Sequence, residues 1–441
     1  MVSVGEINTN ITVMKIFITF FFLLLAYAAF AQDTTASRSG KDLQFDFGGE
    51  VRYQYFYFKH QDWGEAPADK DGFLLARYLG HAGLRAGSHF RAFAELQSSV
   101  SSGQPGKPSA VDENTLDLHQ AYLEYSGLAG SGKTIVLRMG RQELSYGSQR
   151  LVAVREGPNN RQAFDAAKLV FAAKKLKTDL FYANYVIARS NIFDDRFSNA
   201  IRFWGVYHMF NALPVIQNLD LYYLGLYKKT TTFDEGKSPE TRHSIGGRIW
   251  KTKAALRYDM EGLYQFGDFG SSRISAWTLS SNISYTFLQN KFKPQAGLKI
   301  EAISGDKTQD DGKLGTFNPL FPRGAYFGLA ALIGPYNLLD AHPYVQLNLS
   351  KELVFAVDYD MFWRMQKNDG LYAVNGKVLY AGNAGSSRQI GRQLGASLEF
   401  PLGKYFSFKQ EFTWFNAGKY LKQAGPGKDI LMTGSTLTFR F

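Results

Sequence analysis

Hydrophobic and polar residues alternate with a period of two from Phe45 to the end of the chain. The clearest case is residues 353–366, where apolar side chains at every second position oppose Asp358, Asp360 and Arg364. Successive side chains of a strand point to opposite faces, so each such run predicts a strand with one apolar and one polar face. Counting these runs predicts about eighteen strands.

The connections between the predicted strands alternate in length. Short ones are expected at residues 87–88, 126–133, 173–175, 211–218, 251–253, 289–291, 350–351 and 401–403. Long polar ones are expected at residues 59–72, 98–115, 145–164, 188–199, 230–241, 267–273, 304–341, 367–388 and 417–430. Short turns at one end and long loops at the other are typical of outer-membrane barrels. The predicted fold class is therefore all-β, a transmembrane antiparallel β-barrel of outer-membrane type.

A barrel of about eighteen strands is too wide for its own side chains to fill. A water-filled lumen is therefore expected unless a loop folds into it. Residues 304–341 are the longest stretch without alternation, and we expect them to form an inserted or a capping loop.

The start of the chain predicts export. Residues 15–31 contain one Lys, an apolar core and small residues at Ala29 and Ala31, which is the pattern of a signal peptide over residues 1–31. The apolar stretch is shorter than the ~20 residues that a membrane-spanning helix needs. Residues 32–44 are then a polar lead-in, and residues 45–441 form the barrel in the outer membrane.

Composition supports a barrel and limits its chemistry. Aromatic residues make up 15% of the chain, and barrels use them for the lipid-facing surface and the interfacial girdles. There is no cysteine, so disulfides and thiolate metal sites are excluded, and no cofactor is expected. The net charge of +11 in an exported chain favours lipopolysaccharide, small anions or an anionic polymer as partners before nucleic acid.

Residues 127–134 match the nucleotide-binding pattern GxxxxGK[ST]. That motif binds phosphate only between a buried strand and the start of a helix. Here the following residues, Ile135 to Met139, are strand-like, so a Gly-rich hairpin turn is the better interpretation.

Basic residues recur at positions that alternation places inside the barrel. Besides Arg77, His81, Arg85 and Arg91, they are Arg202 and His208 on the eighth strand, Arg242 and Arg248 on the tenth, and Arg257 on the eleventh. The densest basic stretch contains Arg138, Arg141, Arg150, Arg155 and Arg161, with Glu143 and Glu156 between them. Alternation places Arg138 on the inner face of the barrel and Arg141 on the opposite, outer face, although a bulge at Gly140 would bring both inside. The alternative is that these charges are solvated loop residues or contacts to lipopolysaccharide phosphates.

Two segments carry a family resemblance. RMGRQELSYGSQRLVAVREGPNNRQAFDAAKLVF (138–171) and GDKTQDDGKLGTFNPLFPRGAYFGLAALIGPYNL (305–338) resemble the alginate export family of outer-membrane proteins. The resemblance implies an eighteen-stranded barrel with an arginine-lined constriction, through which an anionic polysaccharide passes outward. It also implies pore-lining roles for Arg141, Glu143, Arg150, Arg161 and Asp165.

The leading hypothesis is thus a passive channel for an alginate-like polyuronate, with periplasmic export components as candidate partners. The alternative is a general anion-preferring porin for small solutes. An enzyme is not expected, because none of the seven His residues has the spacing of a nucleophile–base pair.

Overall fold

The computed structural model describes residues 43–441, except residues 69–70, 105 and 351. The predicted signal peptide (1–31) and nearly all of the predicted lead-in (32–44) lie outside the described residues. The first strand begins at Leu43, two positions before the expected start of the barrel.

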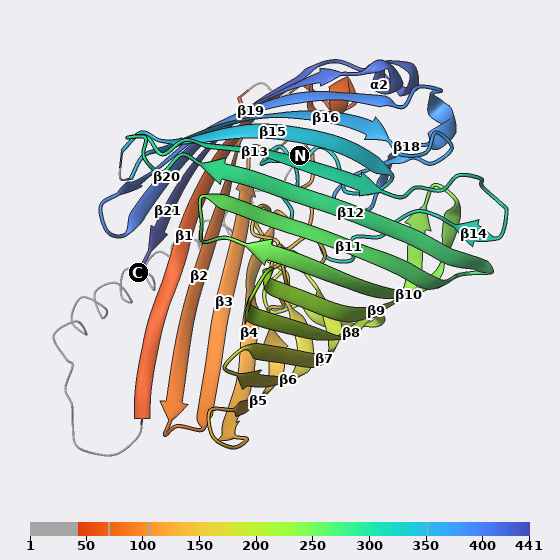
Figure 1. Ribbon diagram of the computed structural model, residues 1–441. Helices are drawn as coiled ribbons and strands as arrows, with labels where there is room; N and C mark the ends of the chain where they lie inside the picture. Colours follow the sequence, from red (N-terminus) through yellow and green to blue (C-terminus); the bar gives the residue numbers. More distant parts are fainter. Residues whose placement is uncertain (1–42, 69–70, 105, 351) are drawn as a thin grey trace. The chain divides into compact units, whose positions relative to one another are not determined.

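Eighteen long strands form one antiparallel sheet (Figure 1). They are β1 (Leu43–Lys59), β2 (Phe73–Ala86), β3 (Phe90–Ser102), β4 (Asn114–Leu128), β5 (Thr134–Gln142), β6 (Phe164–Ala173), β7 (Leu176–Ile187), β8 (Arg196–Leu213), β9 (Gln217–Phe233), β10 (Gly236–Lys251), β11 (Leu256–Phe269), β12 (Ser272–Thr286), β13 (Gln295–Ile303), β15 (Leu338–Asn348), β16 (Val354–Arg364), β19 (Gln389–Leu402), β20 (Phe406–Ala417) and β21 (Ile430–Arg440). The connections contain the short elements η1 (Gln61–Gly64), β14 (Lys313–Leu314), β17 (Leu371–Tyr372), β18 (Val378–Tyr380), η2 (Gly382–Ala384) and α2 (Lys419–Ala424). None of the helices among the described residues is long and apolar enough to cross a membrane.

The sheet closes on itself. Each long strand pairs with its neighbours in sequence, and β1 pairs with β21 from Glu50↔Arg440 to Lys59↔Leu431. Closure leaves no unpaired sheet edge, which is the condition for strands to cross a bilayer. The predicted all-β, eighteen-stranded transmembrane barrel is confirmed.

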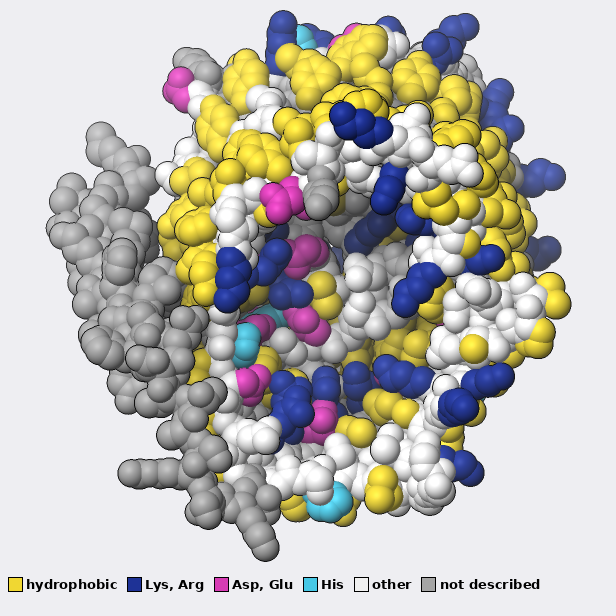
Figure 2. Space-filling view, turned by 60° about the vertical axis from the view of Figure 1, so that its left-hand side comes forward, with side chains coloured by type: hydrophobic (Ala, Val, Ile, Leu, Met, Phe, Trp, Pro, Cys, Tyr) yellow, Lys and Arg dark blue, Asp and Glu magenta, His cyan; other side chains and the backbone are white. Residues whose placement is uncertain are grey.

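The two faces of the sheet differ as alternation predicts. Large apolar side chains are exposed on the outside, among them Leu123 (68%) and Leu279 (59%). Charged side chains such as Arg77, Glu240 and Asp360 are buried inside. Figure 2 shows this contrast, with apolar side chains over the outer surface and acidic, basic and His side chains together in a hollow. The outer face therefore suits lipid and the inner face suits water or polar solutes.

The predicted alternation of short and long connections holds with two corrections. The expected long loops at 230–241 and 267–273 are tight turns, because β9 and β10 meet at residues 234–235 and β11 and β12 at residues 270–271. The polar residues around these turns continue the strand ladder, for example at Thr231↔Ser238. Strands that are polar on both faces show no alternation, which is why these hairpin ends resemble loops in the sequence.

The residues that match the nucleotide-binding pattern form a hairpin. Residues 129–133 join β4 to β5, with Ala129 N donating to Lys133 O at 3.0 Å. A strand, not a helix, follows the Gly-rich turn, so the interpretation as a turn is confirmed.

Candidate transport pathway

Two loops fold into the barrel and pair with each other there. Residues 143–163 connect β5 to β6, and residues 304–337 connect β13 to β15. Val152 and Phe321 form a parallel bridge, in which Ala153 N donates to Phe321 O at 2.9 Å and Phe321 N donates to Leu151 O at 2.8 Å. Of the two alternatives expected for 304–341, an inserted or a capping loop, the structure shows the inserted one. Residues 143–163 are inserted as well, which agrees with the pore-lining positions that the resemblance implies for Arg150 and Arg161.

Phe321 anchors the paired loops to the barrel wall. Its ring centroid lies 5.0 Å from that of Phe164, 5.1 Å from Phe203 and 5.6 Å from Tyr185, which project from β6, β8 and β7. Aromatic rings at these distances pack favourably in addition to burying apolar area. The paired loops are therefore a packed constriction of the lumen.

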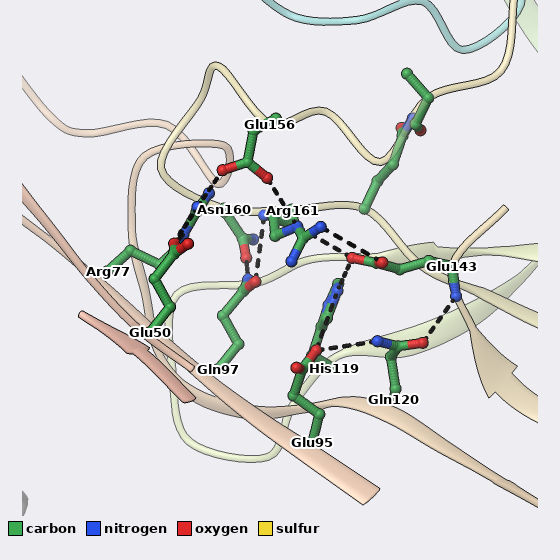
Figure 3. A network of polar contacts seen from close by, with 12 residues as sticks. Glu50, Arg77, Glu95, Gln97, His119, Gln120, Glu143, Glu156, Asn160 and Arg161 are labelled. Carbon is green, nitrogen blue, oxygen red and sulfur yellow. Dashed lines mark hydrogen bonds and ion pairs between the residues drawn. The ribbon is translucent and has the colours of Figure 1, made fainter. Parts of the chain in front are cut away.

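A network of ion pairs joins the wall to the first inserted loop (Figure 3). Arg77 of β2 binds Glu50 of β1 at 2.5 Å and also binds Glu156 of the loop. Arg161 Nε lies 3.0 Å from Glu143 Oε1 and 3.2 Å from Glu156 Oε2. Burial opposes ionisation of Glu143, but the hydrogen bond from His119 and the charge of Arg161 outweigh it, so the pKa of Glu143 lies below its usual value.

Three guanidinium groups converge on Glu156. Arg52, Arg77 and Arg161 all form ion pairs with its carboxylate, and Arg52 also donates to Glu156 O at 2.7 Å. The Glu156 side chain is 49% exposed, whereas Arg77 is fully buried. Two guanidinium groups of the wall and one of the loop therefore surround a loop carboxylate that remains accessible to solvent.

Arg150 ties the same loop to the opposite wall. It donates to Glu301 and Asp259 at 3.0 Å each and to Glu261 at 3.2 Å, which are residues of β13 and β11. Arg248 of β10 continues this cluster through Asp259 and Asp220. Arg150 thus lies in the lumen as expected, and carboxylates balance its charge.

A polar cavity of about 300 Å³ lies beside Arg150. Its wall combines basic and acidic groups, among them Lys299, Arg323, His342 and Asp340. Mixed charge of this kind keeps the pathway wet without making it a strong trap for either sign.

The remaining basic candidates are Arg138 and Arg155 of the basic stretch and Arg85 of β2, and they are placed differently from one another. Arg138 faces the lumen, where it binds Glu124 at 2.6 Å and lies 4.3 Å from the Tyr122 ring centroid. Arg155 belongs to the inserted loop and donates to Tyr185 Oη at 3.3 Å. Arg85 is exposed on β2, and among the described residues no ion pair holds it.

Arg141 and Asp165 bind each other, at 2.9 Å, away from the lumen. They are a cross-strand pair, and the next pair on these strands, Gln142 and Phe164, is fully buried on the lumen side. Gly140 has φ +124°, but the pairing of β5 with β4 and β6 runs through it without a register shift. Alternation therefore correctly predicts the outward position of Arg141, and the pore-lining role implied by the resemblance does not fit this pair.

The eighth strand corrects two further expectations. Phe203 and Tyr207 are the buried, inward residues of β8, so Arg202 and His208 point outward. The inward face is apolar here because Phe203 packs on Phe321 and Tyr207 stacks on Tyr146 of the inserted loops. Arg242 and Arg248 on β10 do face inward, as predicted.

β1 contributes to the lumen in a way that was not expected from the sequence. Glu50 and Arg52 are buried on the lumen side and belong to the network around Glu156. The sequence does contain a pattern that indicates their inward position, because polar and apolar residues alternate strictly here: Glu50, Arg52 and Gln54 with Val51, Tyr53 and Tyr55. His119 was also missed as a network member; it lies at a register shift in β4, where alternation fails.

The closed barrel with a polar, loop-narrowed lumen is that of a porin-type outer-membrane channel. Many solved structures share the fold, and three of them illustrate the likeness. They are Pseudomonas aeruginosa OccK3 (TM-score 0.58, 12% identity, covering 90% of this chain and 96% of that one), P. aeruginosa OccD3 (0.59, 12%, 93% and 97%) and a BenF-like porin from Pseudomonas fluorescens Pf-5 (0.59, 8%, 90% and 98%).

The alginate export family model matches residues 43–429, which is nearly the whole barrel. The chain belongs to the alginate export family. No curated protein sequence matches it.

Proposed function

We propose that this protein passes an anionic polysaccharide of the alginate-like polyuronate class outward through the outer membrane, without chemistry of its own. The convergence of Arg52, Arg77 and Arg161 on the Glu156 carboxylate carries the proposal. Guanidinium groups bind carboxylates as planar forks, and each sugar unit of a polyuronate carries one carboxylate. A uronate that enters the lumen can take the place of Glu156.

The strength of this site suits transport. A solvated Arg–carboxylate pair contributes only ~0.2–1 kcal/mol, so each single contact can form and break as a polymer moves past it. In the cluster of Arg150 and Arg248, acids already balance the positive charges, which weakens the positive electrostatic potential in that part of the lumen.

Planar-bilayer recordings of the refolded mature protein test the proposal. We expect anion-selective current that oligouronate blocks, and no block by a neutral oligosaccharide of equal length. Arg161→Gln should weaken both the selectivity and the block, because it removes one of the three guanidinium groups around Glu156.

Arg141→Gln is the matched control, since it removes the same charge from the outward face. Equal effects of the two substitutions would show that net charge, rather than the lumen site, determines selectivity. A wild-type current that oligouronate does not affect would refute polyuronate passage.

The second candidate is an anion-preferring porin for small solutes. The packing of Phe321 against three wall aromatics favours it, because a fixed constriction admits small solutes more readily than a polymer. The two functions differ in the dependence of block on oligomer length. Long oligouronates should bind better than the monomer if several subsites hold one chain, whereas a small-solute porin should show no such gain.

A further inference from the structure

A second cavity lies at the long-loop end of the barrel, beside the loop residues Arg155, Gly157 and Pro158 that flank Glu156. It has a volume of about 440 Å³ and is formed where β1 and β2 meet the two inserted loops. Its wall is largely aromatic and aliphatic, with Phe56, Phe58, Phe73 and Phe321 among its residues. Cavities of this size and character hold one small organic molecule.

Two cations in this wall have no carboxylate partner among the described residues. Arg155 donates a hydrogen bond to Tyr185 Oη at 3.3 Å, and Lys228 Nζ lies 6.0 Å from the Phe321 ring centroid. All the other basic residues of the basic stretch that face the lumen are held by acids: Arg138 by Glu124, Arg150 by three carboxylates and Arg161 by two. Arg155 and Lys228 therefore stand out because neither forms an ion pair among the described residues, although the charge of Glu240 acts on Lys228 from the neighbouring strand.

The nearest acids are engaged elsewhere. Glu240, the cross-strand neighbour of Lys228, binds Arg242 Nε at 2.5 Å and accepts from Asn318 Nδ2 at 3.0 Å. Asp112 lines the cavity, but its Oδ2 accepts hydrogen bonds from Ser109 and Gln104 of its own loop. The cavity thus combines an apolar body with two available positive groups and one acid already bound within its loop.

We propose that this cavity binds a small amphipathic carboxylate, with an aromatic or aliphatic body against the phenylalanines and its carboxylate between Arg155 and Lys228. A free sugar acid fits less well, because its hydroxyl groups would lose water against the apolar wall without gaining partners. Such a ligand would bind in this cavity at the long-loop end of the barrel, here called the outer-mouth site, whether or not a polymer passes through the lumen.

Titration calorimetry on the refolded protein in detergent tests the proposal without requiring conduction. The probes are 3-phenylpropionate, its neutral counterpart 3-phenylpropanol, and acetate, which has the charge but almost no apolar body. We expect 3-phenylpropionate to bind at least about tenfold more tightly than either of the others, since only it uses both the charge and the apolar wall. Equal binding of the alcohol, or of acetate, would overturn the proposal.

Lys228→Gln should weaken 3-phenylpropionate binding by roughly tenfold, because it removes one charged partner of the carboxylate. Lys229→Gln is the matched control: it removes the same charge one residue further along β9, from an exposed side chain on the opposite face. Arg155→Gln, in the loop rather than in a strand, should reproduce the effect and tests the site if Lys228→Gln does not fold. If Lys228→Gln and Arg155→Gln both bind as the control does, the two cations do not form the site.

The outcome is separable from that of the proposed function. If oligouronate does not block the wild-type channel but 3-phenylpropionate binds, polyuronate passage alone is refuted. If oligouronate blocks the channel but 3-phenylpropionate does not bind, only the outer-mouth site is refuted.

Discussion

Replacing Glu156 with Gln removes the carboxylate on which Arg52, Arg77 and Arg161 converge, and it keeps the size of the side chain. In the wild-type protein these three guanidinium groups share this acid, and Arg77 and Arg161 have Glu50 and Glu143 as well. In Glu156→Gln the negative charge that these guanidinium groups share is removed. A carboxylate from solution can then bind at the solvent-accessible side of the site.

The magnitude follows from Coulomb's law. One unit charge about 4 Å away contributes about 1 kcal/mol in water and about 4 kcal/mol at an effective dielectric constant of about 20. Glu156 is 49% exposed, so the lower part of this range applies. A change of about 1 kcal/mol corresponds to roughly fivefold, and we expect oligouronate to block Glu156→Gln at a roughly fivefold to tenfold lower concentration than wild type.

The assay is the concentration of oligouronate that halves single-channel current at low and high salt. The gain should shrink at high salt, because screening weakens interactions between solvated charges. Asp268→Asn is the matched control: Asp268 is 53% exposed and pairs with Arg273 at 2.7 Å, outside the lumen. Unchanged or weaker block in Glu156→Gln, or an equal gain in Asp268→Asn, would refute the view that Glu156 occupies the polymer's carboxylate site.

Two further predictions concern the inserted loops. Phe321→Ala should remove the three wall contacts and weaken the packing of the loops on the wall by about 3–5 kcal/mol. The open-channel conductance should then be higher and fluctuate more. Unchanged conductance would show that Phe321 does not fix the constriction. Burial, together with the charges of Glu235 and Asp369, raises the pKa of Asp306 to about 7, so this loop carboxyl binds its proton more tightly in the folded protein than in the unfolded chain. The stabilising contribution of protonated Asp306 is complete below the ordinary Asp pKa and is lost as pH rises through 7. Hydrogen exchange of residues 304–316, corrected for the intrinsic rate, should therefore be slower at pH 5 than at pH 8. Asp306→Asn should remove this difference.

The sequence predicted the barrel because the physical rule behind it is strict. A closed sheet between lipid and water requires alternation on every membrane-crossing strand, and this signal survives in a single sequence. On β16 alternation correctly placed Asp360 on the polar, inward face, and on β10 it correctly placed Arg242 and Arg248 in the lumen. The rule carries no information where both faces contact water, so the hairpin ends of β9 to β12 were interpreted as loops.

Alternation failed on β8 for a related reason. It assumes a wet lumen, but the inserted loops make part of the inner wall dry, so Phe203 and Tyr207 point inward and Arg202 and His208 point outward. Nothing local to residues 196–213 reports that Phe321, more than a hundred residues further along the chain, packs on this strand. The resemblance placed Arg141 and Asp165 in the pore for a similar reason, since a motif does not state which face a residue occupies.

The pairing of charges in the lumen bears on how a polyanion would move through it. An open row of arginines would hold a polyuronate tightly, because each new contact would add attraction without releasing any. In this protein Arg77 and Arg161 already bind Glu50, Glu143 and Glu156, so an incoming carboxylate would exchange with a resident one. Such an exchange keeps the guanidinium groups paired at every stage, and its net free energy is small because one Arg–carboxylate pair replaces another of the same kind. Under the proposed function, the acids that offset the positive charge of the lumen arginines are what allow the polymer to leave each site.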